Sequence, residues 1–352
     1  MNEILETDVY VSGDDGVCEY RIPALITTTA HTLIAVCDAR IDRPGDAINN
    51  IDQVCKRSTD GGLSWSPLVV VAEYPGEEAA ADPSLLQDGE TGRIWLFYAH
   101  IPGEYPNADG PSTARRILRL TCVWSDNDGL SWSPPRNISA EIGRSDTEQI
   151  SAGPGRGIQT QGGRLIVPCT TRDRGVANLF SVLVMSDDHG ESWRISPRID
   201  SDIVEPTIVE LQSGDYMVNA RSYRGYGCRA IVTSADHGAT WSDTRDDETL
   251  VEPICQGSLL RHPDGRLLFS NPASPERGDR RNMTVRLSED EGSSWRYSRE
   301  VYPGPSRYSC LTVPADGSVG LLYERDSFAW GDLARSNRRI SFLRFPIEWI
   351  TG

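Results

Sequence analysis

Residues 58–65 read Ser-Thr-Asp-Gly-Gly-Leu-Ser-Trp, and this stretch decides the fold because its pattern recurs along the chain. Written Ser-x-Asp-x-Gly-x-(Ser/Thr)-Trp and called the box below, it begins again at Ser125, Ser186, Ser234 and Ser288. The second copy carries Asn127 in place of aspartate, which keeps a side-chain acceptor. In a hairpin turn the Asp or Asn caps its own backbone, and Gly supplies a positive φ. We expect each box Trp to pack between neighbouring sheets, so the box is structural.

The spacing of the boxes predicts the architecture. The first and fifth copies begin at Ser58 and Ser288, so the four intervals between them average about 57 residues. Propellers of four-stranded blades repeat at roughly this period, and six units would need about 345 of the 352 residues. We therefore predict an all-β fold, a six-bladed β-propeller of four-stranded antiparallel blades. The sixth unit has no box, so we expect both chain ends to build it, with the strand at 340–345 closing the ring.

Charge and hydropathy exclude several classes of partner. The formal net charge is −16, and the sequence has neither a basic cluster nor an apolar run of membrane-spanning length. Nucleic acid, an anionic membrane surface and a membrane span are therefore not expected. The first ten residues lack a basic segment followed by an apolar one. As written, the chain is expected in the cytoplasm, or outside the cell if a signal has been removed.

The eight cysteines show no Cys-x-x-Cys pair and no metal-ligand spacing with the five histidines. Cys37 and Cys55 lie inside apolar, strand-like runs, which favours buried free thiols in a reducing compartment. We expect neither a metal nor an organic cofactor. Residues 153–157, Gly-Pro-Gly-Arg-Gly, lack the Gly-Lys-Ser/Thr of a phosphate-binding loop, so a plain loop is expected there.

Beyond the boxes, the segment Tyr-Arg-Ile-Pro at 20–23 resembles the first-blade motif of the sialidase family, whose propellers carry such boxes. The remaining family motifs follow in order over nearly the entire chain. They include Asp-Pro-Ser at 82–84, Glu-Pro-Thr at 205–207, Asn-Ala-Arg-Ser at 219–222 and Tyr-Ser-Cys-Leu at 308–311. The resemblance implies one catalytic propeller domain over residues 1–352.

Three arginines match those with which the family grips the carboxylate of its substrate: Arg21, Arg221 and Arg280. A planar guanidinium can bind a carboxylate through two parallel, charge-assisted hydrogen bonds, so three of them from separate blades would form a specific clamp. Arg277 and Arg281 compete for the third place, and Arg280 is preferred for its place in the family motif.

The resemblance implies that Tyr308 is the nucleophile and Glu205 its base. The anomeric carbon of a sialic acid already bears a carboxylate, which would repel the Asp or Glu nucleophile of most retaining glycosidases. A neutral phenol avoids this repulsion. Because its ordinary pKa is about 10, it needs a base to remove its proton during attack.

The general acid is matched by Asp46, in the loop 43–50 that precedes the first box. Asp42 and Asp52 compete for this role, and Asp46 is preferred on motif position alone. An acid of this kind has to be protonated near neutral pH, which burial or closure around the substrate would favour.

By family position, Arg40 and Asp82 are expected to hydrogen-bond hydroxyls of the sugar ring, and Glu324 to orient Arg21. The resemblance implies an exo-α-sialidase, a glycoside hydrolase that removes terminal sialic acid from oligosaccharides, glycoproteins or glycolipids with retention, through a covalent tyrosyl intermediate. Two alternatives stay open at this point: a propeller that binds sialic acid without turnover, and a variant that transfers the sialyl group or releases an anhydro product.

Overall fold

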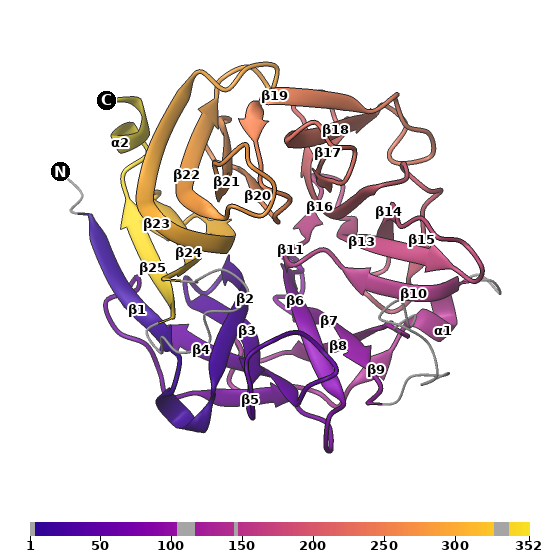
Figure 1. The fold of residues 1–352 in the computed structure, drawn as a ribbon, viewed down its shortest axis with the longest axis vertical. Coiled ribbons are helices and arrows are strands. Elements are labelled where there is room, and N and C mark those ends of the chain that lie inside the picture. The colour runs from indigo at the N-terminus through magenta and orange to yellow at the C-terminus, as the bar shows by residue number, and fades with distance from the viewer. Residues whose placement is uncertain (1–3, 104–116, 144–146, 327–337) are drawn as a thin grey trace.

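The computed structural model describes residues 4–103, 117–143, 147–326 and 338–352, whose strands surround a central axis in chain order (Figure 1). Blade 1 contains β2 (Glu19–Thr27), β3 (Leu33–Arg40), β4 (Ile51–Ser58) and β5 (Val69–Ala72). Blade 2 contains β6 (Ala79–Gln87), β7 (Ile94–Ile101), β8 (Arg119–Ser125) and β9 (Arg136–Asn137). In blade 3, β10 (Thr147–Ala152) and β12 (Ile158–Gln159) both pair with β13 (Leu165–Asp173), which is followed by β14 (Phe180–Ser186) and β15 (Arg194–Ile195).

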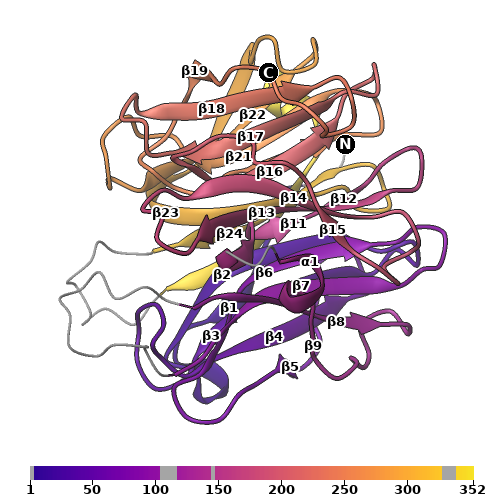
Figure 2. The same ribbon diagram turned by 90° about the vertical axis from the view of Figure 1, so that its right-hand side faces the viewer.

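Blade 4 contains β16 (Ile203–Glu210), β17 (Tyr216–Ser222), β18 (Cys228–Ser234) and β19 (Arg245–Val251). Blade 5 contains β20 (Ser258–Arg261), β21 (Leu267–Pro272), β22 (Arg281–Ser288) and the first part of β23 (Tyr297–Thr312). Blade 6 contains the second part of β23, then β24 (Val319–Arg325), β25 (Arg339–Phe345) and β1 (Leu5–Val11). Viewed from the side, strands of blades 1 and 2 lie at the bottom and strands of blades 4 and 5 at the top (Figure 2).

Both chain ends build blade 6, because β1 pairs antiparallel with β25, from Leu5 opposite Arg344 to Val11 opposite Arg339. This pairing confirms the predicted closure of the ring by the strand at 340–345. Short helices are confined to η1 (Asp14–Gly16), α1 (Ser139–Ile142) and α2 (Glu348–Thr351) in the described ranges. None of the helices described there is long and apolar enough to cross a membrane.

Two expectations need correction. Residues 155–156 are not plain loop, since they form β11 (Gly155–Arg156), which pairs in parallel with β6 of blade 2. Seven cysteines are buried free thiols as expected, but Cys18 is exposed, because it lies outside the strands, between η1 and β2.

Each box is a hydrogen-bonded turn centred on its acidic or amide side chain. In the first box, the Asp60 carboxylate accepts from the Ser64 N–H at 3.0 Å, the Ser64 hydroxyl at 2.5 Å and the Ser58 hydroxyl at 2.7 Å. The bonds from Ser64, which are the largest cause, lower the pKa of Asp60 to about 2. Asn127 accepts the equivalent backbone bond at 3.0 Å, which confirms that Asn can replace Asp there.

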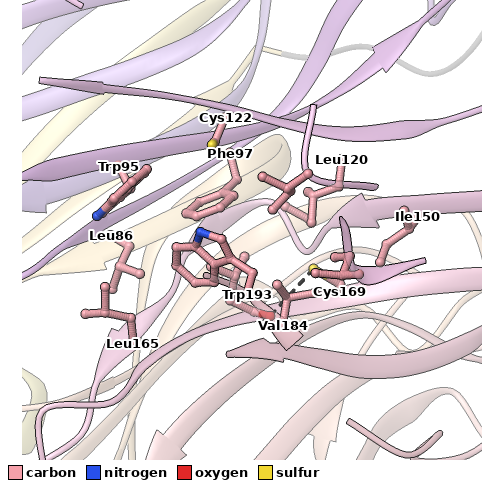
Figure 3. Packing of buried hydrophobic residues seen from close by; sticks show 14 of the residues in the cluster. Leu86, Trp95, Phe97, Leu120, Cys122, Ile150, Leu165, Cys169, Val184 and Trp193 are labelled. Carbon is pink, nitrogen blue, oxygen red and sulfur yellow. Dashed lines mark hydrogen bonds between the residues drawn. The ribbon is translucent and has the colours of Figure 1, made fainter. Parts of the chain in front are cut away.

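The core lies between the blades. Six buried hydrophobic clusters in the described residues each combine side chains from two neighbouring blades, including blades 6 and 1. Figure 3 shows the cluster between blades 2 and 3, where Trp193 of the third box meets Trp95 edge-on at 5.7 Å and Phe97 at 5.1 Å between ring centroids. Edge-to-face pairs of this kind add to the energy of area burial. The box Trp therefore helps to join successive sheets.

The box glycine also lies at this contact. Gly190 has φ of 87°, and a Cβ atom there would stand 2.2 Å from Cζ2 of Trp95 in the preceding blade. Gly62 has the same role at the closing contact between blades 1 and 6, where an added Cβ atom would stand 2.2 Å from Cε1 of Phe342. Glycine is needed here both for its conformation and for the space that it leaves.

We expect Gly190→Ala to lower the free energy of unfolding by about 2–4 kcal/mol, because positive φ and the clash with Trp95 both oppose a Cβ atom. Gly214→Ala is the matched control, since Gly214 has φ of 89° and nothing within 4 Å of the added atom, and it should cost only about 1 kcal/mol. Denaturant unfolding measures both. Equal losses would contradict the role of the inter-blade contact.

Candidate active site

The innermost strands β2, β6 and β16 share a backbone feature that turns side chains toward the centre of the ring. Ile22, Asp82 and Glu205 each precede a proline, and each has positive φ, at 59°, 61° and 43°. At each of them the pairing with the second strand of the blade shifts register. A bulge redirects side chains, and positive φ in a β-branched residue such as Ile22 is strained. The strain is located where these blades reach the central cavity.

The cavity has a volume of about 360 Å³ and is lined by sixteen described residues. Eight of the nine residues singled out from the sequence are among them: Arg21, Arg40, Asp46, Asp82, Glu205, Arg221, Arg280 and Tyr308. The ninth, Glu324, lies behind Arg21. The competing residues Asp42, Asp52, Arg277 and Arg281 are not part of the lining, so the cavity favours the preferred position in each case.

Tyr308 and Glu205 form a short polar contact in the cavity. The Tyr308 hydroxyl donates to Oε1 of Glu205 at 2.5 Å, and Nη1 of Arg221 donates to both oxygens of Glu205, at 2.9 and 3.0 Å, and to the Tyr308 oxygen at 3.1 Å. Tyr308 is only 6% exposed. A phenol, a base and a cation therefore meet within hydrogen-bond distance, as proton transfer from the phenol would require.

Burial raises the pKa of Tyr308 well above its ordinary value, and the negative charge of Glu205 adds to the effect. The positive charges of Arg221 and Arg280 oppose it. The guanidinium of Arg21 lies 5.7 Å from the centre of the Tyr308 ring, and that of Arg280 lies 5.9 Å away. The resting phenol is thus protonated, with three cations placed to stabilise a phenolate that forms on it.

The other two arginines of the predicted clamp, Arg21 and Arg280, form hydrogen bonds with groups outside the cavity lining. Nε of Arg21 donates to Glu324 at 2.8 Å, and the same carboxylate accepts from the Ile22 N–H at 2.8 Å. Burial alone would lower the pKa of Arg21, but the negative charges of Glu324 and Asp46 and the hydrogen bond to Glu324 act in the opposite direction, and the pKa is raised. Nη2 of Arg280 donates to the carbonyl oxygen of Ile254 at 2.9 Å. These contacts fix both guanidinium groups at the cavity wall.

Arg40 ties the loop of Asp46 to the pocket. Its Nη2 donates to Asp46 at 2.8 Å and its Nη1 donates to Glu19 at 3.1 Å, while Glu19 also accepts from the Gly45 N–H at 3.3 Å. The side chain of Arg40 is 3% exposed, whereas that of Asp46 is 48% exposed. Asp46 therefore lies at the solvent edge of the cavity, and Tyr308 lies at its base.

Two carboxyl groups lie together on the side of blades 1 and 2. The Asp82 N–H donates to Asp38 at 3.0 Å, and Nε2 of Gln53 donates to the same oxygen at 2.7 Å. Burial raises the pKa of Asp82 to about 7, with further contributions from the charges of Glu205 and Asp46. Burial also raises the pKa of Asp38, and the charge of Asp82 contributes.

Comparisons with known proteins agree with this geometry. Residues 49–321 match the family model of the BNR repeat-like domain. A sialidase of Micromonospora viridifaciens is 34% identical over 374 residues, an alignment that covers 99% of this chain and 54% of that protein. The chain belongs to the sialidase family.

Two further relatives support the assignment of this sialidase-family chain. A sialidase of Bacteroides fragilis is 30% identical, with coverage of 89% of this chain and 61% of that protein. The structure of the Hadza microbial sialidase Hz136 superimposes with a TM-score of 0.86 and 31% identity, over 98% of this chain and 69% of that one. The chain thus spans little more than half the length of the curated relatives that it matches first.

The cavity also contains residues that sequence reasoning missed. Tyr223 accepts a hydrogen bond from Nη2 of Arg221 at 2.7 Å, and its place two residues after Arg221 is the signal that could have found it. Arg307 lines the cavity directly before Tyr308, and burial, with the nearby charge of Arg21, lowers its pKa to about 10. Asp38 also lines the cavity, but it belongs to none of the motifs recognised in the sequence. Within the described part of the chain, no group of three or more His, Cys, Asp or Glu side chains could hold a metal ion.

Asp82 generates a prediction about pH. Its pKa is about 7 when folded and has an ordinary value of 3.8, so between these values the folded protein binds more protons than the unfolded chain and loses stability as the pH rises. We expect Asp82→Asn to reduce this loss, as measured by urea unfolding at a series of pH values. Asp60→Asn is the control, because its pKa of about 2 lies outside the window. Wild type and Asp82→Asn with the same slope would contradict this assignment.

Proposed function

We propose that the chain is an exo-acting, retaining α-sialidase that removes terminal sialic acid from oligosaccharides, glycoproteins or glycolipids. The observation that carries the proposal is the 2.5 Å contact of Tyr308 with Glu205 at the base of a cavity that also contains Arg21, Arg221 and Arg280. The family supports the substrate class, and the placement of the side chains supports the mechanism below.

Binding begins with the carboxylate of the sugar, which the three arginines can receive through charge-assisted hydrogen bonds. The net charge of −16 does not prevent this. Charges are screened beyond about 8 Å at physiological salt, so the arginines within the cavity dominate the local potential. Arg40 and Asp82 are left to contact the ring hydroxyls.

In the first step the Tyr308 oxygen forms a bond to the anomeric carbon, and the phenolic proton passes to Glu205. The bond from that carbon to the leaving oxygen breaks, and Asp46 gives its proton to that oxygen. The position of Asp46 at the solvent edge suits this role, because the leaving group departs there. The product of this step is a sialyl group covalently bound to Tyr308.

In the second step Asp46 takes a proton from water, and the water oxygen attacks the anomeric carbon. The bond to Tyr308 breaks, and the phenolate recovers its proton from Glu205. Each step inverts the anomeric centre, so the two together retain its configuration. Glu205, Asp46 and Tyr308 all return to their starting protonation states.

Tyr308→Phe removes the nucleophilic oxygen while it keeps the ring. With a fluorogenic α-sialoside as substrate, we expect turnover by the wild type and a fall of about 10³-fold or more in kcat for the variant, because attack through oxygen is no longer available. Tyr297→Phe, on the same strand but outside the cavity, should keep full activity.

Full activity of Tyr308→Phe would reject the covalent mechanism. A folded wild type that binds sialic acid but shows no turnover from pH 4 to 8 would instead favour a propeller that only binds this sugar. Analysis of the products by NMR would separate hydrolysis from transfer and from release of an anhydro sugar.

Asp46→Asn should show the signature of a lost general acid. For a leaving group that is a poor base, such as an aryl oxide, protonation matters little to bond cleavage, whereas the alkoxide of a natural sugar depends on it. We expect kcat for a sialyl-oligosaccharide to fall about 10²–10⁴-fold, and the first step with the aryl substrate to fall much less. Single-turnover measurements compare the two, and equal losses would argue against Asp46 as the acid.

A further inference from the structure

A buried ion pair outside the cavity lies under two of its arginines. Nη1 of Arg229 on β18 donates to Oε2 of Glu252 at 2.7 Å, and the two side chains are 0% and 1% exposed. Neither residue lines the cavity. The pair therefore has no direct route to a substrate.

The pair holds the backbone on both sides of Arg221. The second oxygen of Glu252 accepts from the Ser222 N–H at 2.6 Å, directly after Arg221. Arg229 donates from Nε to the Asn219 side chain at 2.6 Å and from Nη2 to the Asn219 carbonyl at 3.2 Å, two residues before Arg221. The strand segment that carries Arg221 is thus bonded at both ends to one ion pair.

The same ion pair also contacts the backbone segment that holds Arg280. Nη1 of Arg229 also donates to the Cys255 carbonyl at 2.8 Å. The neighbouring carbonyl, that of Ile254, is the acceptor for Nη2 of Arg280 at 2.9 Å. Ile254 has φ of 57°, an unfavourable conformation for a β-branched residue, so its peptide needs an external hold to keep this orientation.

Stability alone gives a poor account of such a pair. Removing two charges from water costs free energy that their mutual attraction often fails to recover, and apolar residues of similar volume are frequently as stable or more stable. Placement of groups is a benefit that apolar replacements do not supply. Here the hydrogen bonds of one pair reach the supports of both arginines.

We propose that Arg229 and Glu252 are positioning residues that set Arg221 and Arg280 as one unit for binding of the substrate carboxylate. The inference rests on the proposed function, because it assigns the two arginines to the carboxylate. It extends that function to a linked pair beneath blades 4 and 5, which couples the placement of one clamp arginine to that of the other.

The test compares Arg229→Met, Glu252→Leu and the double variant. Each single change leaves one buried charge unpaired and should lower the midpoint of thermal unfolding strongly. The double variant has no unpaired charge, so its midpoint should lie above those of both single variants, although the Ser222 N–H and the Asn219 and Cys255 carbonyls lose a hydrogen bond. Its KM for a sialoside, and its dissociation constant for free sialic acid, should nevertheless stay about 10- to 100-fold higher, because small displacements of binding groups have effects of this size.

Arg261 and Glu291 provide the control, since they form an ion pair at 2.6 Å within blade 5 that also hydrogen-bonds to the backbone of blade 4, but they lie outside the cavity and its supports. Arg261→Met with Glu291→Leu should leave KM and sialic acid binding unchanged. Both double variants are measured at a temperature well below their unfolding midpoints, so that a population of unfolded protein does not enter the result.

Three results are distinguishable. A stable Arg229→Met/Glu252→Leu variant with weakened binding and an unaffected control supports the positioning role. The same variant with wild-type KM and sialic acid affinity overturns it and leaves the proposed function intact. A wild type that neither binds nor cleaves sialosides overturns the proposed function, and the positioning role fails with it.

Discussion

Packing between neighbouring sheets is the constraint on which the site depends, because the groups that meet in the cavity come from opposite ends of the chain. Arg21 and Glu324 are separated by 303 positions in the sequence, and only closure of the ring brings them to 2.8 Å. The backbone hydrogen bonds between β1 and β25 close the ring within blade 6, and the close packing of Gly62 against Phe342 joins blade 6 to blade 1. A site assembled in this way is as rigid as the inter-blade contacts that support it.

Rigid placement matters because the cavity concentrates charge. Five arginines and four carboxyl groups line about 360 Å³. In such a space desolvation and neighbouring charges shift pKa values together, which explains why the pKa values of Tyr308 and Asp82 are both raised. Buried carboxylates hold two of these cations, since Glu324 pairs with Arg21 and Glu19 pairs with Arg40.

The sequence predicted the parts of this molecule that short motifs encode. The spacing of the boxes predicted the number of blades, and the motifs around Arg21, Glu205 and Tyr308 identified residues that line the cavity. Arg307 was missed because it lies in a register shift of the strand pairing, which changes the direction of side chains in a way that alternation along a strand does not reveal. Asp38 was missed because it belongs to no recognised motif. Arg229 and Glu252 escaped for another reason: their partners are mostly backbone atoms, which carry no signature in residue type.

Backbone strain connects these observations. Positive φ occurs at Ile22, Asp82, Glu205 and Ile254, all next to or in the cavity wall, and each position is held by hydrogen bonds from a different part of the chain. Glycine at such a position would relieve the strain, but it would also remove the side chain or loosen the peptide that the site uses. A glycine substitution that stabilised the fold at one of these positions would therefore disturb the placement of the side chains in the cavity. Packing between the blades has to offset the unfavourable free energy of these conformations. The structural boxes, which contribute to that packing, therefore support the candidate catalytic groups.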